Sequence, residues 1–230
     1  MFDSHAHIRL PNSIFCTDDL ILPYFLNGNY FLQAQGVLPE KLTNENWKLK
    51  NRNLELVIQQ EKELQIGEVG LDKRFLEKIN LENQINFFLN CINLAIKYKR
   101  SLFIHCVRYK GLMIEILTRY KKELQAGELR VLWHGFDGSV EMGKQLSKLK
   151  VVLSLRPGFR FDLARFWKEE GYKGNIVTLE TDYVEKGESF NEELYSEILE
   201  NHYERVALML NKSINECNTW SKNAGKIFKN

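Results

Sequence analysis

The sequence predicts an α/β fold in which strands and helices alternate along the whole chain. Short apolar runs typical of strands recur, and the segments between them carry apolar residues at the three- and four-residue steps of a helix. The sequence also lacks the glycine-rich phosphate loop that usually announces a doubly wound open sheet. This pattern favours a parallel sheet closed into a TIM-like (β/α) barrel.

Seven apolar runs are expected to form strands. They are Met1–Ile8, Tyr30–Val37, Gln65–Leu71, Ser101–Val107, Arg130–Phe136, Lys150–Leu155 and Ile176–Thr181. A closed barrel of this type needs eight strands, and the best candidate for the missing one is the weaker segment Ser13–Thr17. If this segment is a strand, the first crossover helix is shortened or missing.

The clearest helix is expected over Leu81–Arg100. Apolar residues follow one another there at helical steps from Ile85 to Ile96, and the basic end suits a helix C-terminus. Similar patterns predict helices over Gly111–Leu124, over Val140–Leu149 with Ser139 as the N-cap, and over much of Glu188–Phe228.

Length and composition indicate an ordinary globular protein. The 230 residues fit a single domain, 1–230, because β/α barrels reach about 250 residues as one unit. A hydrophobic share of 44% and a charged share of 27% argue against a disordered or a membrane protein. The net charge of +2 permits binding to nucleic acid without implying it.

The distribution of cysteines and apolar residues predicts a cytoplasmic location. The four cysteines form no C-x-x-C pair, which favours reduced thiols over a disulfide framework. Polar residues follow the first two positions, unlike a secretory signal, and no apolar run approaches the roughly 18 residues of a membrane span. We expect no membrane partner and a monomer or weak oligomer.

Four of the five histidines lie at or near the C-terminal ends of predicted strands, where barrel enzymes carry their catalytic groups: His5, His7, His105 and His134. Alternate residues of a strand share a face, so His5 and His7 project the same way, roughly 7 Å apart. Two imidazoles from one strand can bind one metal ion, although an isolated H-x-H is also a common chance pair.

Carboxylates complete the pattern. Glu68 stands between two glycines in IGEVGLD, and Glu180 and Asp182 end the run VTLETD. A carboxylate that points into a barrel is costly unless it is paired or bound to metal. Each of these residues could have a structural role alone, but five strands that deliver nitrogen or oxygen ligands to one rim indicate a metal centre.

These motifs resemble those of the TatD family of metal-dependent deoxyribonucleases, within the wider amidohydrolase-like group. FDSHAHI matches the opening D-x-H-x-H, IGEVGLD matches G-E-x-G-L-D, FIHC and WHGFDGS match the two later histidine motifs, and LETD matches the closing E-T-D. QAQGVLPE is similar to the G-x-H-P stretch and SKNAGKIF to the C-terminal N-x-x-x-x-F, so the resemblance runs almost end to end.

The resemblance implies a site with two divalent metal ions. Four ligands would surround the first ion: His5, His7, Glu68 and Asp182. Glu68 would bridge to the second ion, which His105 and His134 would also hold. Zinc, manganese and magnesium are the candidate ions, although mixed imidazole and carboxylate ligation suits zinc, manganese or iron better than magnesium.

The implied activity is hydrolysis of DNA phosphodiester bonds by a metal-activated water. Asp182 would act as the general base, and Glu68 would bridge the ions. Three arginines of this chain are expected to substitute for rim groups of the family that it lacks and to contact phosphate: Arg74, Arg108 and Arg156.

The sequence departs from the family pattern at the rim of the site. Leu38 stands where the family has histidine, Val107 where it has arginine, and Val184 where it has proline. These losses leave open two alternatives, hydrolysis of a small cyclic amide by the same centre and a catalytically weak metal-binding protein. The first alternative usually involves a carboxylated lysine bridge, whereas Glu68 stands at that position here.

His202 is expected to have no part in the site. It falls in the helical C-terminal region, away from the strand ends, and we expect it on a helix surface.

Overall fold

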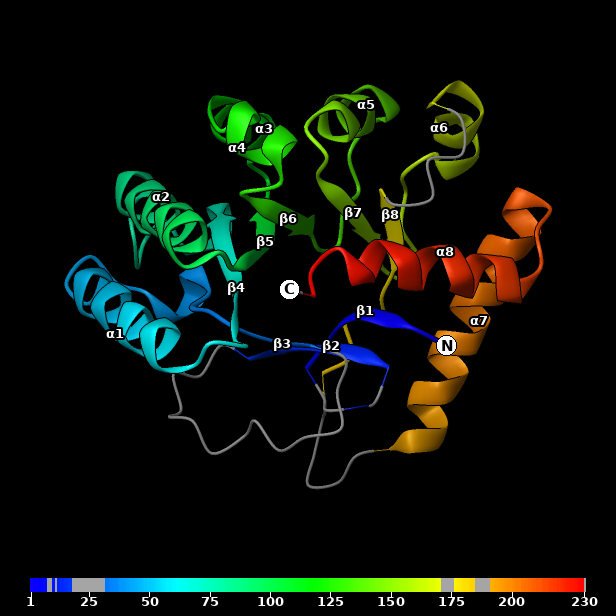
Figure 1. Cartoon of the computed structure of the whole chain (residues 1–230), viewed down its shortest axis with the longest axis horizontal. Helices are drawn as coiled ribbons and strands as arrows, with labels where there is room; N and C mark the ends of the chain where they lie inside the picture. Colours follow the sequence, from blue (N-terminus) through cyan, green and yellow to red (C-terminus); the bar gives the residue numbers. More distant parts are fainter. Residues whose placement is uncertain (8–9, 11, 18–31, 171–175, 185–190, 230) are drawn as a thin grey trace. The chain divides into compact units, whose positions relative to one another are not determined.

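The computed structural model describes residues 1–7, 10, 12–17, 32–170, 176–184 and 191–229. Within these residues, eight strands form a parallel sheet in which neighbours follow the order of the chain. Figure 1 labels them. They are β1 (Asp3–Ala6), β2 (Ser13–Thr17), β3 (Leu32–Gln35), β4 (Gln65–Asp72), β5 (Ser101–Val107), β6 (Arg130–Trp133), β7 (Val152–Leu155) and β8 (Val177–Leu179).

Helices alternate with these strands, and the predicted α/β fold of the TIM-barrel type is confirmed. The α-helices are α1 (Trp47–Gln60), α2 (Leu81–Tyr98), α3 (Lys110–Arg119), α4 (Lys121–Ala126), α5 (Val140–Lys148), α6 (Leu163–Glu170), α7 (Glu192–Leu210) and α8 (Ile214–Lys226). Two short 3₁₀ helices are η1 (Pro39–Lys41) and η2 (Lys73–Phe75).

The eighth strand lies where the sequence predicted it, at Ser13–Thr17. It pairs in parallel with β1, and only residues 7–12 connect the two strands. A connection of this length is too short for a crossover helix, since such connections need about a dozen residues. The length of this connection agrees with the expectation of a shortened or missing first crossover helix.

The predicted ranges agree with the observed elements within a few residues, with two exceptions. One predicted helix is split at Tyr120 into α3 and α4, and another is split at Asn211 into α7 and α8. Asn211 adopts a left-handed conformation with φ of 51°, which ends α7, and Ser213 opens α8 with a capping box. Parts of three predicted ranges lie outside the described residues: Ile8, residues 30–31 and residues 188–190.

The chain divides into two compact units, and the expectation of one domain stays a prediction. The first unit comprises residues 1–15, 29–31 and 134–230, and the second comprises residues 16–28 and 32–133. Among the described residues, no helix has the length and apolar character needed to cross a membrane.

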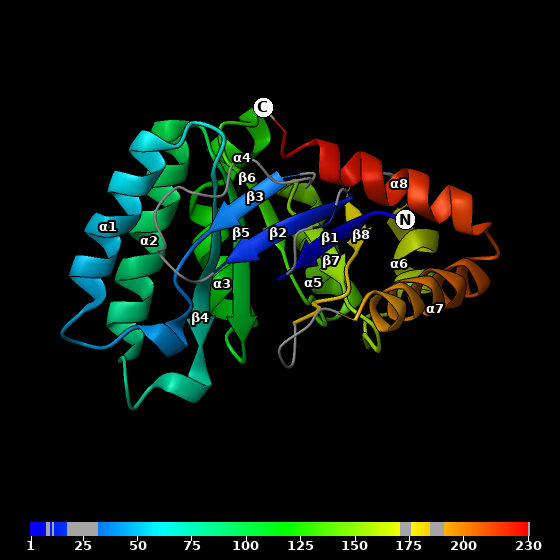
Figure 2. The same ribbon diagram turned by 90° about the horizontal axis from the view of Figure 1, so that it is seen from below.

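The second unit is organised around strands β3 to β6. β4 and β5 pair over Val69–Asp72 and Ile104–Val107, and β5 continues into pairing with β6. Helix α2 starts at the N-cap Asn80 and buries Phe87 and Phe88, and it lies beside α1 (Figure 2).

The first unit joins the start of the chain to its end. β7 pairs with β8, and the segment after β8 forms a bridge between Tyr183 and Ala6 of β1. Helix α5 begins at Ser139, whose side chain accepts a hydrogen bond from the Met142 amide, as predicted for its N-cap. Helix α8 reaches β8 through the Ser221 hydroxyl, which accepts a hydrogen bond from the amide of Leu179.

His202 is buried, so its expected place on a helix surface is wrong. Only 3% of the residue is exposed, and its Nε2 lies 2.7 Å from the Leu155 carbonyl oxygen at the end of β7. The ring also packs edge-on against Phe159. Burial lowers the pKa of His202 to about 4, although the contact with the Leu155 carbonyl opposes this shift.

The buried His202 predicts a loss of stability in mild acid. Its pKa in the folded protein, about 4, is below the ordinary value of 6.5, so unfolding takes up a proton once the pH falls below about 6.5. Between pH 7 and pH 5 this group should remove about 2 kcal/mol of unfolding free energy. His202→Gln should reduce the pH dependence by that amount in urea titrations at the two pH values. An identical pH dependence in both proteins would contradict the assignment.

Candidate metal centre

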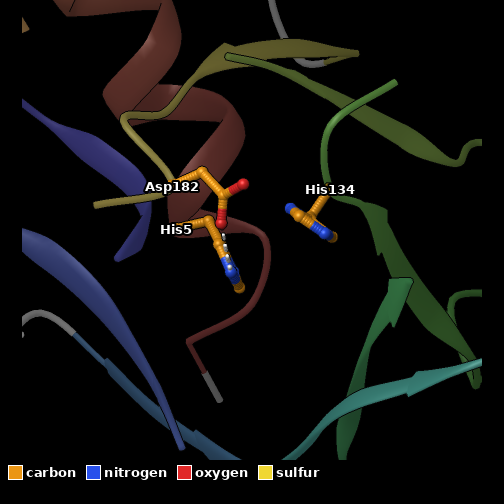
Figure 3. A group of neighbouring side chains, drawn as sticks. All are labelled: His5, His134 and Asp182. Atoms are coloured by element: carbon orange, nitrogen blue, oxygen red, sulfur yellow. Dashed lines mark ion pairs between the residues drawn. The ribbon is translucent and has the colours of Figure 1, made fainter. Parts of the chain in front are cut away.

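Three side chains of the first unit converge on one point (Figure 3). They are His5 on β1, His134 directly after β6, and Asp182 after β8. Their ligand atoms all lie within 4.8 Å of one another. His5 Nε2 is 3.7 Å from Asp182 Oδ1, and the centroids of the His5 and His134 rings are 4.4 Å apart.

His7 adds a second imidazole from the same end of β1. Its Nε2 lies 3.8 Å from Asp182 Oδ1, the oxygen that His5 also approaches. The two rings are edge-on, with centroids 5.1 Å apart. His5 is fully buried, whereas the His7 side chain is 20% exposed, so the cluster extends from the interior towards solvent.

The backbone pairing between β1 and the segment after β8 fixes the position of Asp182. Its amide donates to the His5 carbonyl at 3.1 Å, and the His7 amide donates to the Tyr183 carbonyl at 2.9 Å. Asp182 itself has a left-handed backbone with φ of 53°, which turns the chain at this residue.

Asp3 is a positioning residue that links the same two segments. One of its oxygens accepts from the amides of Thr181 and His5, at 3.0 and 3.1 Å. The other accepts from the Thr181 hydroxyl at 2.6 Å and the Tyr195 hydroxyl at 3.1 Å. Burial raises the pKa of Asp3 to about 7, against the effect of these hydrogen bonds.

Glu180 supports His134 in the first unit. Its Oε1 lies 3.3 Å from His134 Nδ1 and accepts a hydrogen bond from the Gly135 amide at 2.7 Å. Its Oε2 accepts from the Ser154 hydroxyl. Burial raises the pKa of Glu180, and His134 opposes that shift. Because Nδ1 faces Glu180, Nε2 is the ring nitrogen of His134 that suits a metal ion.

The second unit carries the other predicted ligands on adjacent strands. Glu68 lies on β4 and His105 on β5, with ligand atoms within 4.8 Å of each other. The flanking glycines allow the two strands to approach. A Cβ atom at Gly70 would overlap the His105 carbonyl oxygen, and one at Gly67 would overlap the Phe103 side chain.

Asp72 lies next to a ring nitrogen of His105, as Glu180 lies next to a ring nitrogen of His134. His105 Nε2 is 3.0 Å from Asp72 Oδ2, and Asp72 also receives Nε of Arg74 at 3.0 Å and its Nη2 at 2.5 Å. Burial raises the pKa of Asp72, but the hydrogen bonds from His105 and Arg74 outweigh it and hold the pKa below its usual range. Sequence reasoning missed this role, although Asp72 closes the motif that contains Glu68.

The three predicted arginine contacts lie in different surroundings. Arg156 belongs to the first unit, where its Nη1 is 3.7 Å from Asp182 Oδ2 and its side chain is 54% exposed. The guanidinium of Arg74 in the second unit is engaged by Asp72. Arg108, also in the second unit, is exposed and has a left-handed backbone with φ of 65°.

The donor set of the first unit fits a divalent transition metal. It combines imidazole nitrogens with a carboxylate, the ligands that zinc, manganese and iron take in proteins. Metal-binding histidines usually have their other ring nitrogen paired with a carboxylate or a carbonyl, and Glu180 supplies this partner to His134. Sequence reasoning named Glu180 as a strand-end carboxylate but did not foresee this pairing.

The sequence model of a known family matches most of the chain. This family is described as TatD related DNase, and the match covers residues 26–229. The opening FDSHAHI motif lies ahead of the matched residues. No curated protein matches the chain.

Solved structures of related proteins share the fold. The crystal structure of YJJV, a TatD homologue from Escherichia coli K12, has a TM-score of 0.73 at 16% identity, covering 100% of this chain and 97% of that one. A hydrolase TatD family protein from Entamoeba histolytica has a TM-score of 0.66 at 18% identity, covering 94% and 84%. An uncharacterized amidohydrolase from Saccharomyces cerevisiae has a TM-score of 0.64 at 16% identity, covering 87% and 81%.

The hydrogen bonds of Asp3 predict a large loss of stability on truncation. Asp3→Ala leaves two amides and two hydroxyls without their acceptor and should lower the unfolding free energy by roughly 3 kcal/mol or more. Tyr195→Phe removes one donor and should cost about 1–2 kcal/mol. In the Asp3→Ala background, Tyr195→Phe should cost clearly less, which urea denaturation can measure. Fully additive losses would show that the two residues do not act together.

Proposed function

Since the chain belongs to the TatD-related DNase family, whose members are hydrolases, we propose that it is a metal-dependent phosphodiesterase acting on DNA. The observation that carries this proposal is the convergence of His5, His134 and Asp182 in the first unit (Figure 3). The cluster offers two buried imidazoles and a carboxylate, of which the first proposed ion would take His5 and Asp182 and the second would take His134. The family match supports the choice of substrate.

The proposed ligands follow the family resemblance. His5, His7, Asp182 and Glu68 would hold one ion, and Glu68, His105 and His134 would hold a second. Zinc, manganese or magnesium is the proposed metal. When bound, such ions lower the pKa of a water molecule and neutralise charge on a phosphoryl group.

Within this proposal, the residues of the chain position the substrate and move a proton. Asp182 accepts the proton of the attacking water, because its carboxylate lies beside both imidazoles of β1. Asp3 fixes the backbone on either side of this site, and Glu180 orients the His134 ring. Arg156, 3.7 Å from Asp182, is a phosphate contact within reach of the reaction.

Metal removal and return test the proposal. The purified protein should contain about one to two divalent ions per chain by elemental analysis, because its ligands sit on a folded scaffold. After chelation it should not cleave a plasmid or an oligonucleotide, and zinc or manganese should restore cleavage.

The other possible results of this experiment would either overturn the proposal or favour one of the two alternative functions. A protein that binds no transition metal even after reconstitution would overturn the proposal as a whole. Turnover of a small cyclic amide without DNA cleavage would favour the amide hydrolase, and bound metal without either activity would favour a catalytically weak family member.

Asp182→Asn separates proton transfer from metal binding. The amide is nearly isosteric and can still offer an oxygen to the ion, but it cannot accept the proton, so turnover should fall by roughly two to four orders of magnitude. Metal content should fall much less. Glu68→Gln should lose both metal and activity, because its charge serves both proposed ions. Near-normal turnover of metal-loaded Asp182→Asn would show that another group accepts the proton.

A further inference from the structure

A cavity of about 680 Å³ lies beside Asp182 in the first unit. Asp182 and Thr181 line part of it, and the loop Arg156–Arg160 between β7 and α6 lines another part. Its volume falls in the range of roughly 300–1,000 Å³ typical of ligand sites. Of the residues that line this cavity, the proposed function gives a role only to Asp182 and Arg156.

The loop presents its two arginines on a fixed turn. The Phe159 amide donates to the Arg156 carbonyl at 3.1 Å, and Gly158 has φ of +77°, a conformation that favours glycine. Phe159 is buried, with its ring against His202 and 5.8 Å from the Arg205 guanidinium. The anchored ring leaves Arg156 and Arg160 exposed on the same cavity, so the backbone that carries them is already ordered before a ligand binds.

The charges of the cavity indicate an anionic ligand. Two guanidinium groups line it, and guanidinium is the side chain best suited to bind phosphate through two parallel hydrogen bonds. Two carboxylates also line it, Asp182 and Asp137. Asp182 is assigned to the metal in the proposed function, so its charge is offset there and the arginines dominate the remaining space.

We infer that this cavity binds the phosphate next to the cleaved one on a DNA strand, with Arg160 as a specificity-determining residue. The inference rests on the proposed function and adds to it a preference for substrates with at least two phosphates. It also supplies phosphate contacts to a chain that has Leu38 and Val107 where the family has histidine and arginine. Arg156, beside Asp182, contacts the DNA strand close to the cleaved phosphate, and Arg160 contacts the neighbouring phosphate.

Binding of an oligonucleotide that cannot be cleaved tests the cavity independently of turnover. The probe is a fluorescein-labelled, hydrolysis-resistant phosphorothioate oligonucleotide, followed by anisotropy with zinc or manganese added, so that the charge of Asp182 is offset as the inference requires. Arg160→Gln should weaken binding about five- to tenfold and reduce the slope of log K against log salt by about 0.7, the value for one phosphate contact on a single strand.

Arg165→Gln is the matched control. Arg165 is an exposed arginine on α6 that pairs with Glu141 and Glu169 and does not line the cavity, so its replacement should leave binding within about twofold of the wild type. Equal losses in both variants, or no loss in Arg160→Gln, would overturn the inference. Oligonucleotide binding that depends on Arg160, without cleavage under any metal, would instead count against the proposed function alone.

The number of phosphates in the substrate gives the second test. Arg160→Gln should raise KM for an oligonucleotide about five- to tenfold with kcat little changed, and should leave KM for bis(p-nitrophenyl) phosphate unchanged because that substrate has a single phosphate. A similar rise in KM for both substrates would mean that Arg160 holds the cleaved phosphate and would overturn the inference of a neighbouring subsite.

Discussion

The buried carboxylate of Asp3 holds together the two segments on which the candidate ligands of the first unit lie. It stands two residues before His5 on β1 and accepts hydrogen bonds from Thr181, the residue before Asp182. Both of its oxygens are used, so a shift of one segment along the other would break several hydrogen bonds at once. The spacing between the imidazoles and the Asp182 carboxylate is therefore set by backbone pairing rather than by side-chain freedom.

The same chemical arrangement recurs in both units, where a buried carboxylate faces a candidate ligand histidine. Glu180 faces His134, and Asp72 faces His105. The carboxylate favours a proton on the nitrogen that faces it, which leaves the other nitrogen as a lone-pair donor. The two carboxylates differ in their remaining partners, because Glu180 accepts from a backbone amide and a hydroxyl, whereas Asp72 is paired with the cation of Arg74.

Much of this could be predicted from the sequence because the signals are local. The strand Ser101–Val107 and the N-cap at Ser139 follow from apolar patterning and capping chemistry within a few residues. The histidine–carboxylate pairs could not, because they join strands 30 to 50 residues apart in the chain and depend on which neighbours the sheet brings together. The burial of His202 had a local signal, since it lies on the same helical stripe as the buried Leu199 and Val206.

The positions that depart from the family motifs differ physically from those that match them. Leu38 and Val107 are partly exposed and Val184 is 52% exposed, whereas Asp3 and Glu180 are fully buried with several hydrogen-bond donors. Replacing a buried carboxylate leaves its donors unsatisfied, but replacing a residue at the rim leaves no such deficit.

The buried partners of the candidate ligands, Asp3 and Glu180, are therefore fixed by the stability of the fold, while the rim is free to change. The Arg156–Arg160 loop belongs to the rim, because its guanidinium groups are exposed on a turn that the buried Phe159 anchors. Substitutions of these arginines can alter which anions bind without disturbing the hydrogen bonds of Asp3 and Glu180. Substrate preference and assembly of the candidate metal centre are thus physically separable in this chain.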